Sequence, residues 1–250
     1  MIYKKSSEEI KIMRRAGAVV ADVFEALEEA LRPGVSTSEL DAIAEKIIKD
    51  AGATPSFKGY RGFPASICAS PNHVIVHGIP SAMKLEEGDI ISLDVGAFLN
   101  GYHGDSAWTF PVGDVAPEAA ELLKVTEASL DAALERCKPG NRLGDIGFAV
   151  EEVAESAGFS IVREYAGHGV GRALHEEPSI PNYGPAGRRE VLAPGMTLAI
   201  EPMVNLGGAG TKTLADGWAV VTADGSLSAH FEHTVAITED GHEVLTKRRS

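Results

Sequence analysis

The stretch DIISLDVGAFLNGYHGDSAWTF (89–110) decides the fold of this chain. Two apolar segments of strand length flank the dipeptide Asn100-Gly101. Asn-Gly is the strongest short-range signal for a two-residue hairpin loop, because both residues tolerate positive φ. The stretch therefore predicts an antiparallel hairpin in which Leu99 lies opposite Tyr102.

The hairpin brings two acidic side chains to one face. In this register Gly96 lies opposite Asp105, and Asp94 lies opposite Ala107. Because side chains alternate along a strand, Asp94 and Asp105 share a face as diagonal neighbours, roughly 7–8 Å apart at the backbone. Carboxylates this close repel each other, and a bound cation would relieve the repulsion. The hairpin alone leaves open the alternative that both acids face solvent near its end.

A helical pattern on the N-terminal side of the hairpin occurs twice. VFEALEEALRPGVSTSELDAIAEKIIKDAG (23–52) aligns with SLDAALERCKPGNRLGDIGFAVEEVAESAG (129–158) at a constant offset of 106. In the first copy, apolar periodicity and Ser-x-x-Glu capping boxes predict helices from Ser6 to Leu31 and from Ser36 to Gly52. Matching breaks and apolar positions over so long a stretch indicate a duplication.

The duplication extends, more weakly, to the strands. LEEGDIISLDV (85–95) resembles LAPGMTLAIEP (192–202) at an offset of 107, which aligns Asp94 with Glu201. A unit of this length is too long for a solenoid repeat, and no Pro- or Ser-rich linker separates the copies. We therefore expect a single domain over residues 1–250, with pseudo-symmetric halves spanning roughly 1–112 and 113–250.

The order of the elements favours one fold class. Helices come first in each half and strands follow, which favours an α+β fold with an antiparallel sheet over a doubly wound fold. The strands are predicted at 74–77, 90–99, 102–111, 160–166, 196–204, 217–222 and 229–238.

Two glutamates in the second half lie in segments too apolar for a solvent edge. Glu201 lies in TLAIEPMV, and Glu232 lies in HFEHTVAIT. If the halves face each other about a pseudo-two-fold axis, Asp94 and Glu201 converge at that axis. Four carboxylates in one pocket need a metal, and such an oxygen-rich ligand set suits Mn, Fe or Co as well as Zn.

Three of the eight histidines stand in Gly- and Pro-rich segments beside predicted strands. His77 lies in VIVHGIP, and His168 and His175 lie in GHGVGRALHEEP, whose glycines let the backbone approach a ligand closely. These three are candidate site residues. The remaining histidines are interpreted as ordinary core or surface residues: His73, His103, His230, His233 and His242.

The composition excludes several classes of protein. Hydrophobic residues make up 44% of the chain and charged residues 24%, as in ordinary globular proteins. The net charge of −13 argues against nucleic-acid binding through a general basic surface. No apolar stretch approaches membrane-spanning length, no secretory signal is present, and two cysteines are too few for a disulfide framework. We therefore expect a cytoplasmic protein with no membrane partner.

Taken together, these residues resemble the bacterial type I methionine aminopeptidases of the pita-bread metallopeptidase family. The similarity covers nearly the whole chain. The resemblance implies the pita-bread α+β fold, with two pseudo-symmetric halves around a central antiparallel sheet. The motifs that carry it are YRGFPASICASPNHVIVHGIP (60–80), DIISLDVGAFLNGYHGDSAWTF (89–110), REYAGHGVGRALHEEP (163–178), MTLAIEPMV (196–204) and DGWAVVTADGSLSAHFEHT (216–234).

The resemblance also implies the site and its chemistry. Two divalent ions per chain (Co, Mn, Fe or Zn) would be held by Asp94, Asp105, His168, Glu201 and Glu232. Asp105 and Glu232 would bridge the two ions. Glu201 would accept a proton, His175 would stabilise the oxyanion, and His77 would contact the scissile nitrogen, so that both histidines also bind substrate. The methionine pocket would be lined by Phe57, Tyr60, Phe63, Cys68, Leu174 and Trp218.

The implied activity is removal of the initiator methionine from nascent proteins, with preference for a small second residue. The partner would be the N-terminal Met of a nascent polypeptide. Such an activity leaves ribosome association open, and the family suggests a monomer. Two alternatives remain. One is a proline-directed aminopeptidase of the same fold, although such relatives usually carry an extra N-terminal domain. The other is a non-catalytic pita-bread binding protein, although such relatives lose ligands and this chain retains all five.

Overall fold

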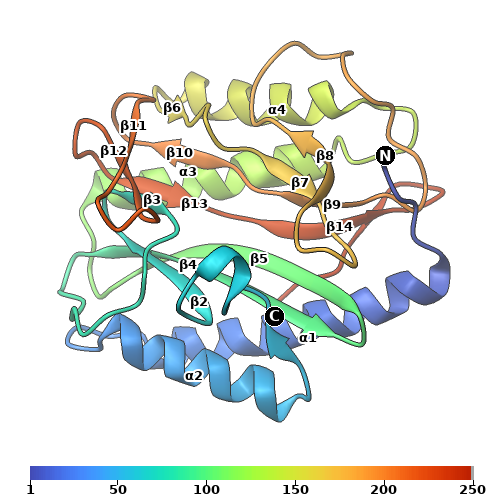
Figure 1. The fold of residues 1–250 in the computed structure, drawn as a ribbon. Coiled ribbons are helices and arrows are strands. Elements are labelled where there is room, and N and C mark those ends of the chain that lie inside the picture. Colours follow the sequence, from blue (N-terminus) through green and yellow to red (C-terminus); the bar gives the residue numbers. More distant parts are fainter. Residues whose placement is uncertain (249–250) are drawn as a thin grey trace.

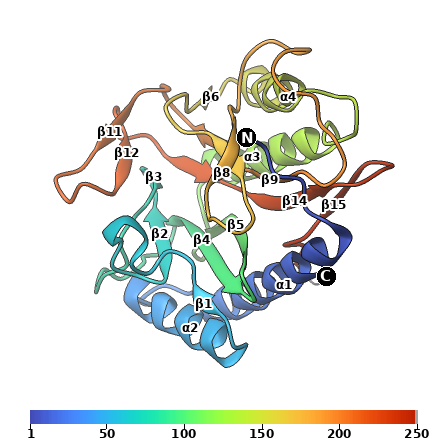
Figure 2. The ribbon, with the colours of Figure 1, turned by 45° about the vertical axis from the view of Figure 1, so that its right-hand side comes forward.

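Within residues 1–248, the part of the chain that the computed structural model describes, four long helices lie on two outer faces with the strands between them (Figure 1). Helices α1 (Ser7–Ala30) and α2 (Thr37–Asp50) cover one face. Helices α3 (Pro117–Leu134) and α4 (Leu143–Ser156) cover the opposite face, as the turned view in Figure 2 also shows. None of the helices in this described part has the length and apolar character needed to cross a membrane.

The helices confirm the predicted starts and the duplication. Ser6 and Ser36 cap α1 and α2, and each forms a reciprocal capping box with a glutamate three residues later. Helices α2 and α4 have 14 residues each and begin at Thr37 and Leu143, which reproduces the offset of 106.

The first-half hairpin has the predicted register. Strands β4 (Ile90–Leu99) and β5 (Tyr102–Pro111) pair antiparallel, with Leu99 opposite Tyr102 and Gly96 opposite Asp105. Strands β1 (Thr54–Pro55) and β2 (Ile67–Pro71) pair antiparallel with β4. The antiparallel α+β prediction is therefore correct.

The second half repeats this ladder with an interruption. The predicted strands 196–204 and 229–238 are not continuous. They divide into β9 (Thr197–Ile200), β10 (Met203–Asn205), β13 (Ser228–His230) and β14 (His233–Ile237). Pro202 has no N–H to donate, so the ladder stops there. The register nevertheless continues across the gap, because His233 lies opposite Ile200 and His230 lies opposite Met203.

Three other predicted strands are shorter than expected. The segment 74–77 ends at Val76, because His77 adopts a left-handed backbone with a φ of 59°. The segment 160–166 forms a strand only at Ser160–Ile161, whose partner β10 begins at Met203. The segment 217–222 forms a strand only from Val220, because a turn with Gly217 at a φ of 76° precedes it.

The remaining elements are short. A short 3₁₀ helix, η1 (Tyr60–Gly62), precedes β2. The other strands are β3 (Val74–Val76), β6 (Ser160–Ile161), β7 (Gly167–Gly169), β8 (Glu176–Ile180), β11 (Thr211–Thr213), β12 (Val220–Thr222) and β15 (His242–Val244).

Each helical layer packs on its own apolar core. Phe24 and Leu93 belong to a cluster between α1, α2 and the first-half strands. Ile146 and Leu198 belong to a second cluster, between α3, α4 and the second-half strands. Trp108 on β5 packs against both clusters, so the strands between the helical layers form the junction of the halves.

The close approach of α1 to the C-terminal segment predicts one stability effect. A Cβ on Gly17 would lie 2.1 Å from the carbonyl oxygen of Leu245, which is backbone and cannot rotate away. Alanine favours a helix over glycine by about 1 kcal/mol, but overpacking costs about 1–3 kcal/mol. We expect Gly17→Ala to lower the free energy of unfolding in urea, despite the better helix former.

The matched control for this prediction is Gly241→Ala. A Cβ there meets nothing within 4 Å, so the change should stay within about 0.5 kcal/mol of the parent. A Gly17→Ala protein as stable as the parent would show that α1 and the C-terminal segment are not in tight contact.

Candidate metal centre and substrate cavity

The two halves are joined by side-chain hydroxyls rather than by a regular ladder. Strand β5 runs along residues 230–234, and the Glu232 N–H donates to the Ala107 carbonyl at 2.8 Å. The Thr234 hydroxyl donates to the Asp105 carbonyl at 2.7 Å and accepts from the Asp105 N–H at 3.1 Å. The hydroxyl of Ser106 donates to the Glu232 carbonyl. These bonds hold Asp105 and Glu232 side by side.

A cavity of about 150 Å³ opens beside this junction. Every residue that the sequence or the resemblance proposed for the site lines it. These residues are Phe57, Tyr60, Phe63, Cys68, His77, Asp94, Asp105, His168, Leu174, His175, Glu201, Trp218 and Glu232. Three further residues of the wall were not predicted: Arg61, Val76 and His230.

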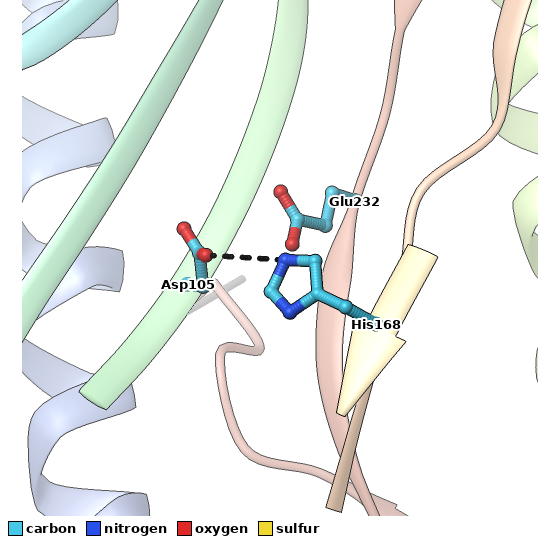
Figure 3. Close-up of side chains that lie close together, drawn as sticks. All are labelled: Asp105, His168 and Glu232. Carbon is cyan, nitrogen blue, oxygen red and sulfur yellow. Dashed lines mark ion pairs between the residues drawn. The ribbon is translucent and has the colours of Figure 1, made fainter. Parts of the chain in front are cut away.

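Three side chains form the tightest cluster in the cavity (Figure 3). Asp105, His168 and Glu232 each offer one potential ligand atom, and these three atoms lie within 4.8 Å of one another. Asp105 comes from β5, His168 from β7, and Glu232 from the break between β13 and β14. Glu201 adjoins the cluster, with its Oε1 3.6 Å from His168 Nε2. Asp94, on β4, lines the same cavity.

The hydrogen bonding of His168 indicates what the cluster is suited to bind. Its Nδ1 lies 2.8 Å from the carbonyl oxygen of Gly169, which can only accept, so Nδ1 carries the proton. Burial lowers the pKa of His168, which keeps the ring neutral. The Nε2 lone pair therefore faces Asp105 Oδ2 at 3.8 Å and Glu201 Oε1 at 3.6 Å. Lone pairs facing one another favour a cation between them, and such an orienting backbone bond is typical of metal-binding histidines.

The carboxyl groups of the cavity also indicate a site for a cation. Burial raises the pKa of Asp105 to about 7. Burial, reinforced by neighbouring carboxylates, also raises the pKa values of Asp94, Glu201 and Glu232 well above their usual range. Asp94 Oδ1, Asp105 Oδ1 and Glu232 Oε1 are buried and have no hydrogen-bond partner among residues 1–248. Such atoms are costly unless something binds them, and this oxygen and nitrogen donor set fits a divalent metal.

His175 stands at the mouth of the cavity on the loop between β7 and β8. Its Nδ1 lies 3.0 Å from the Tyr60 hydroxyl, and the two rings stack. Burial and neighbouring histidines lower the pKa of His175 to about 3, so the ring is neutral. The loop is fixed by Glu176, which accepts the backbone N–H groups of Arg172 and Ala173 and pairs with the buried Lys5 at 2.5 Å.

His77 also lines the cavity and adopts a left-handed backbone conformation that is uncommon for a histidine. Its ring makes edge contacts with the rings of Tyr165 and Trp218. Burial lowers the pKa of His77. Strained backbone of this kind concentrates at functional sites.

The apolar wall of the cavity forms one cluster. Phe57, Phe63, Cys68 and Leu174 are buried, and Phe63 packs edge-on against Trp218 with ring centroids 5.1 Å apart. Burial, with nearby carboxylates, raises the pKa of the Cys68 thiol well above its usual value. Cys68 is therefore a neutral wall residue rather than a nucleophile.

His230 was interpreted from the sequence as an ordinary residue, but it lies in the cavity wall. Its Nε2 is 3.5 Å from Glu201 Oε2. The signal was its spacing, because His230 and Glu232 are two residues apart in one predicted strand and so share a face. Other histidines fit the ordinary interpretation: His103 contacts Ser56 and His233 contacts Thr246.

The raised pKa of Asp105 predicts how metal-stripped protein responds to pH. In the unfolded chain an aspartate titrates near 4, whereas Asp105 in the folded chain titrates at about 7. Between these values the folded state holds a proton that the unfolded state has lost. The contribution of Asp105 to the free energy of unfolding therefore falls as the pH rises from about 4 to about 7, by about 1 kcal/mol per pH unit, whereas buried histidines such as His175 and His230, whose pKa values are lowered to about 3, contribute with the opposite sign.

Urea unfolding of chelator-treated protein at pH 5.5 and 7.5 checks this. Because the buried histidines are common to both proteins, we expect the stability of the parent relative to Asp105→Asn to be lower at pH 7.5 than at pH 5.5. Added Mn²⁺ should stabilise the parent more at pH 7.5 than at pH 5.5. A parent that loses no stability relative to Asp105→Asn at the higher pH would contradict the raised pKa of Asp105.

Comparisons with known proteins agree with this site. Residues 11–239 match metallopeptidase family M24. Methionine aminopeptidase 1 of Bacillus subtilis (strain 168) is 57% identical over 247 residues, which cover 99% of this chain and 100% of that protein. Methionine aminopeptidase of Escherichia coli (strain K12) is 46% identical over 247 residues, covering 98% and 94%.

Solved structures agree as well. The crystal structure of methionine aminopeptidase from Thermotoga maritima superposes with a TM-score of 0.98 at 46% identity, covering 99% of this chain and 100% of that chain. Prolidase from Pyrococcus furiosus superposes with a TM-score of 0.81 at 27% identity, covering 99% of this chain and 66% of that chain. The resemblance seen in the sequence and the pita-bread fold are thus confirmed, and the chain belongs to metallopeptidase family M24.

Proposed function

We propose that this chain is a methionine aminopeptidase that removes the initiator methionine from nascent proteins and prefers a small second residue. One observation carries the proposal: a single cavity joins buried acids from both halves to a neutral His168 and to an apolar wall. Relatives named methionine aminopeptidase, 46% to 57% identical over nearly their full lengths, support it.

The donors come from both halves, which favours one catalytic domain made of residues 1–112 and 113–250. Asp94 and Asp105 belong to the first half, and His168, Glu201 and Glu232 to the second. We infer that these five hold two divalent ions, with Co, Mn, Fe and Zn as candidates. When bound, such a pair lowers the pKa of a water and polarises the scissile carbonyl.

The protein's own groups then move the proton and hold the charge. We infer that Glu201, which lines the cavity with its Oε1 3.6 Å from His168 Nε2, accepts a proton from the attacking water. We infer that the neutral ring of His175 accepts a hydrogen bond at Nδ1 from the Tyr60 hydroxyl, 3.0 Å away, which leaves Nε2–H free to donate to the developing oxyanion. We assign the contact with the scissile nitrogen to His77, which lines the same cavity.

The apolar wall is suited to a methionine side chain. Phe63, Trp218, Cys68 and Leu174 offer aromatic and aliphatic surface, and thioethers make favourable contacts with aromatic rings. Phe57 and Tyr60 complete the wall. The partner is then the N-terminal Met of a nascent polypeptide. We propose that the protein acts as a monomer in the cytoplasm, and that it meets its substrates at the ribosome.

Release of methionine from a Met-Ala peptide tests the proposal directly. We expect release that a chelator abolishes and that Co²⁺, Mn²⁺ or Fe²⁺ restores, because buried oxygens of Asp94, Asp105 and Glu232 have no hydrogen-bond partner among residues 1–248. Met-Leu peptides should react more slowly than Met-Ala peptides. No release with any of these metals would contradict the proposal, and faster cleavage of Ala-Pro than of Met-Ala would indicate a proline-directed enzyme instead.

The role of His175 predicts a specific kinetic change. His175→Ala should lower kcat on Met-Ala peptides about 100- to 1000-fold with little change in KM, because oxyanion stabilisation acts only in the transition state. The matched control is His73→Ala, since His73 is exposed and does not line the cavity. A His175→Ala enzyme with unchanged kcat and a raised KM would assign His175 to ground-state binding alone.

A further inference from the structure

His230 is buried in the wall of the cavity beside Glu201. It ends β13, its exposed fraction is 2%, and its Nε2 has no hydrogen-bond partner among residues 1–248. The nearest charged group to that nitrogen is Glu201, whose Oε2 lies 3.5 Å away. An unpartnered polar atom this deeply buried points to an interaction that completes the site.

The pairing register places His230 where the first half has an acid of the site. The pairs compared are β4 with β5 in the first half, and β9 and β10 with β14 and β13 in the second. Asp105 lies opposite Gly96, two residues beyond Asp94. His230 lies opposite Met203, two residues beyond Glu201. Since the duplication aligns Asp94 with Glu201, His230 is the structural counterpart of Asp105.

The backbone around this pair is fixed on both sides. The N–H of His230 donates to the Thr109 hydroxyl at 2.9 Å, and that hydroxyl donates back to the His230 carbonyl at 2.8 Å. The carbonyl of Glu201 accepts a bond from Asn182 Nδ2 at 2.8 Å. These bonds fix the backbone positions from which the two side chains approach each other.

Glu201 is therefore enclosed by two imidazoles. Its Oε1 lies 3.6 Å from His168 Nε2, and its Oε2 lies 3.5 Å from His230 Nε2. His168 presents a lone pair to Glu201, because the Nδ1 of His168 carries the proton. Because the His168 nitrogen beside Oε1 cannot donate a hydrogen bond, the carboxylate of Glu201 is best oriented by a hydrogen-bond donor beside Oε2.

We propose that His230 is a positioning residue that donates an Nε2–H hydrogen bond to Glu201 Oε2. This bond holds Glu201 Oε1 toward His168 and the metal centre. Partners of this kind orient the ligands of metal sites and typically affect metal affinity or activity about 10- to 100-fold. The inference rests on the proposed function, in which Glu201 binds metal and accepts the proton.

Two substitutions of His230 distinguish a hydrogen-bond donor from a residue that only packs in the wall. His230→Leu removes the donor, and His230→Gln keeps an N–H group of similar reach. Co²⁺ titration calorimetry, the visible spectrum of the Co²⁺-loaded protein and the kcat and KM for Met-Ala peptides are measured for each variant. His233→Leu is the matched control, because His233 lies in the same segment and bonds to Thr246 outside the cavity.

We expect His230→Leu to lose about 10- to 100-fold in Co²⁺ affinity or kcat, with an altered Co²⁺ spectrum and little change in KM. His230→Gln should retain most of the affinity, spectrum and kcat, and His233→Leu should leave affinity and spectrum unchanged. If His230→Leu does not fold by circular dichroism, His230→Met, which also lacks a donor, replaces it.

Two results would overturn the proposal. One is a leucine variant with parental affinity, spectrum and kcat. The other is a glutamine variant as impaired as the leucine variant, with fewer Co²⁺ equivalents bound, which would make His230 a direct ligand. If the parent protein shows no peptidase activity, the proposed function fails, while the Co²⁺ titration and spectrum still decide the role of His230.

Discussion

The structure depends on the seam where β5 lies along residues 230–234. Hydroxyls of Ser106, Thr109 and Thr234 replace a regular backbone ladder there and fix the two segments in register. Asp105 and Glu232 project from this seam into one buried space. Two carboxyl groups in such a space cannot both be ionised unless a positive charge lies close to them. The seam that joins the halves therefore also creates the requirement for a cation.

The surrounding structure is arranged around that requirement. Helices α1 to α4 cover the outer faces of the central strands (Figure 1) and bury an apolar cluster on each side. The interruption at Pro202 lets Glu201 leave the ladder, and the loop that carries His175 is tied to the N-terminal segment through Lys5 and Glu176. A cavity lined by buried carboxyl groups lowers the stability of the fold unless a bound cation neutralises them. Catalytic sites commonly have this property.

The sequence predicted those parts of the fold that neighbouring residues determine, such as turns and helix starts. Asn100-Gly101 fixed the β4–β5 register to the residue, because a two-residue loop admits one pairing. Capping boxes at Ser6 and Ser36 located two helix starts. The residues proposed for the cavity came from motifs and the family resemblance, and the structure brings all of them together.

What the sequence did not predict depends on contacts between distant segments. The pairing of β10 with β13 spans the long connection between Asn205 and Ser228, so no turn signal related His230 to Met203. The contact of Lys5 with Glu176 joins residues far apart in the chain. The breaks beside Glu201 and Glu232 had one local cue, Pro202, but apolar flanks favoured continuous strands.

The most direct test of the central claim is an anomalous diffraction measurement on crystals of the Mn²⁺-loaded protein. We expect two anomalous peaks inside the cavity, with Asp105 and Glu232 contacting both and His168 contacting one. Peaks confined to the protein surface, or a cavity whose acids turn outward into solvent, would contradict the claim that the halves meet around shared metal ions.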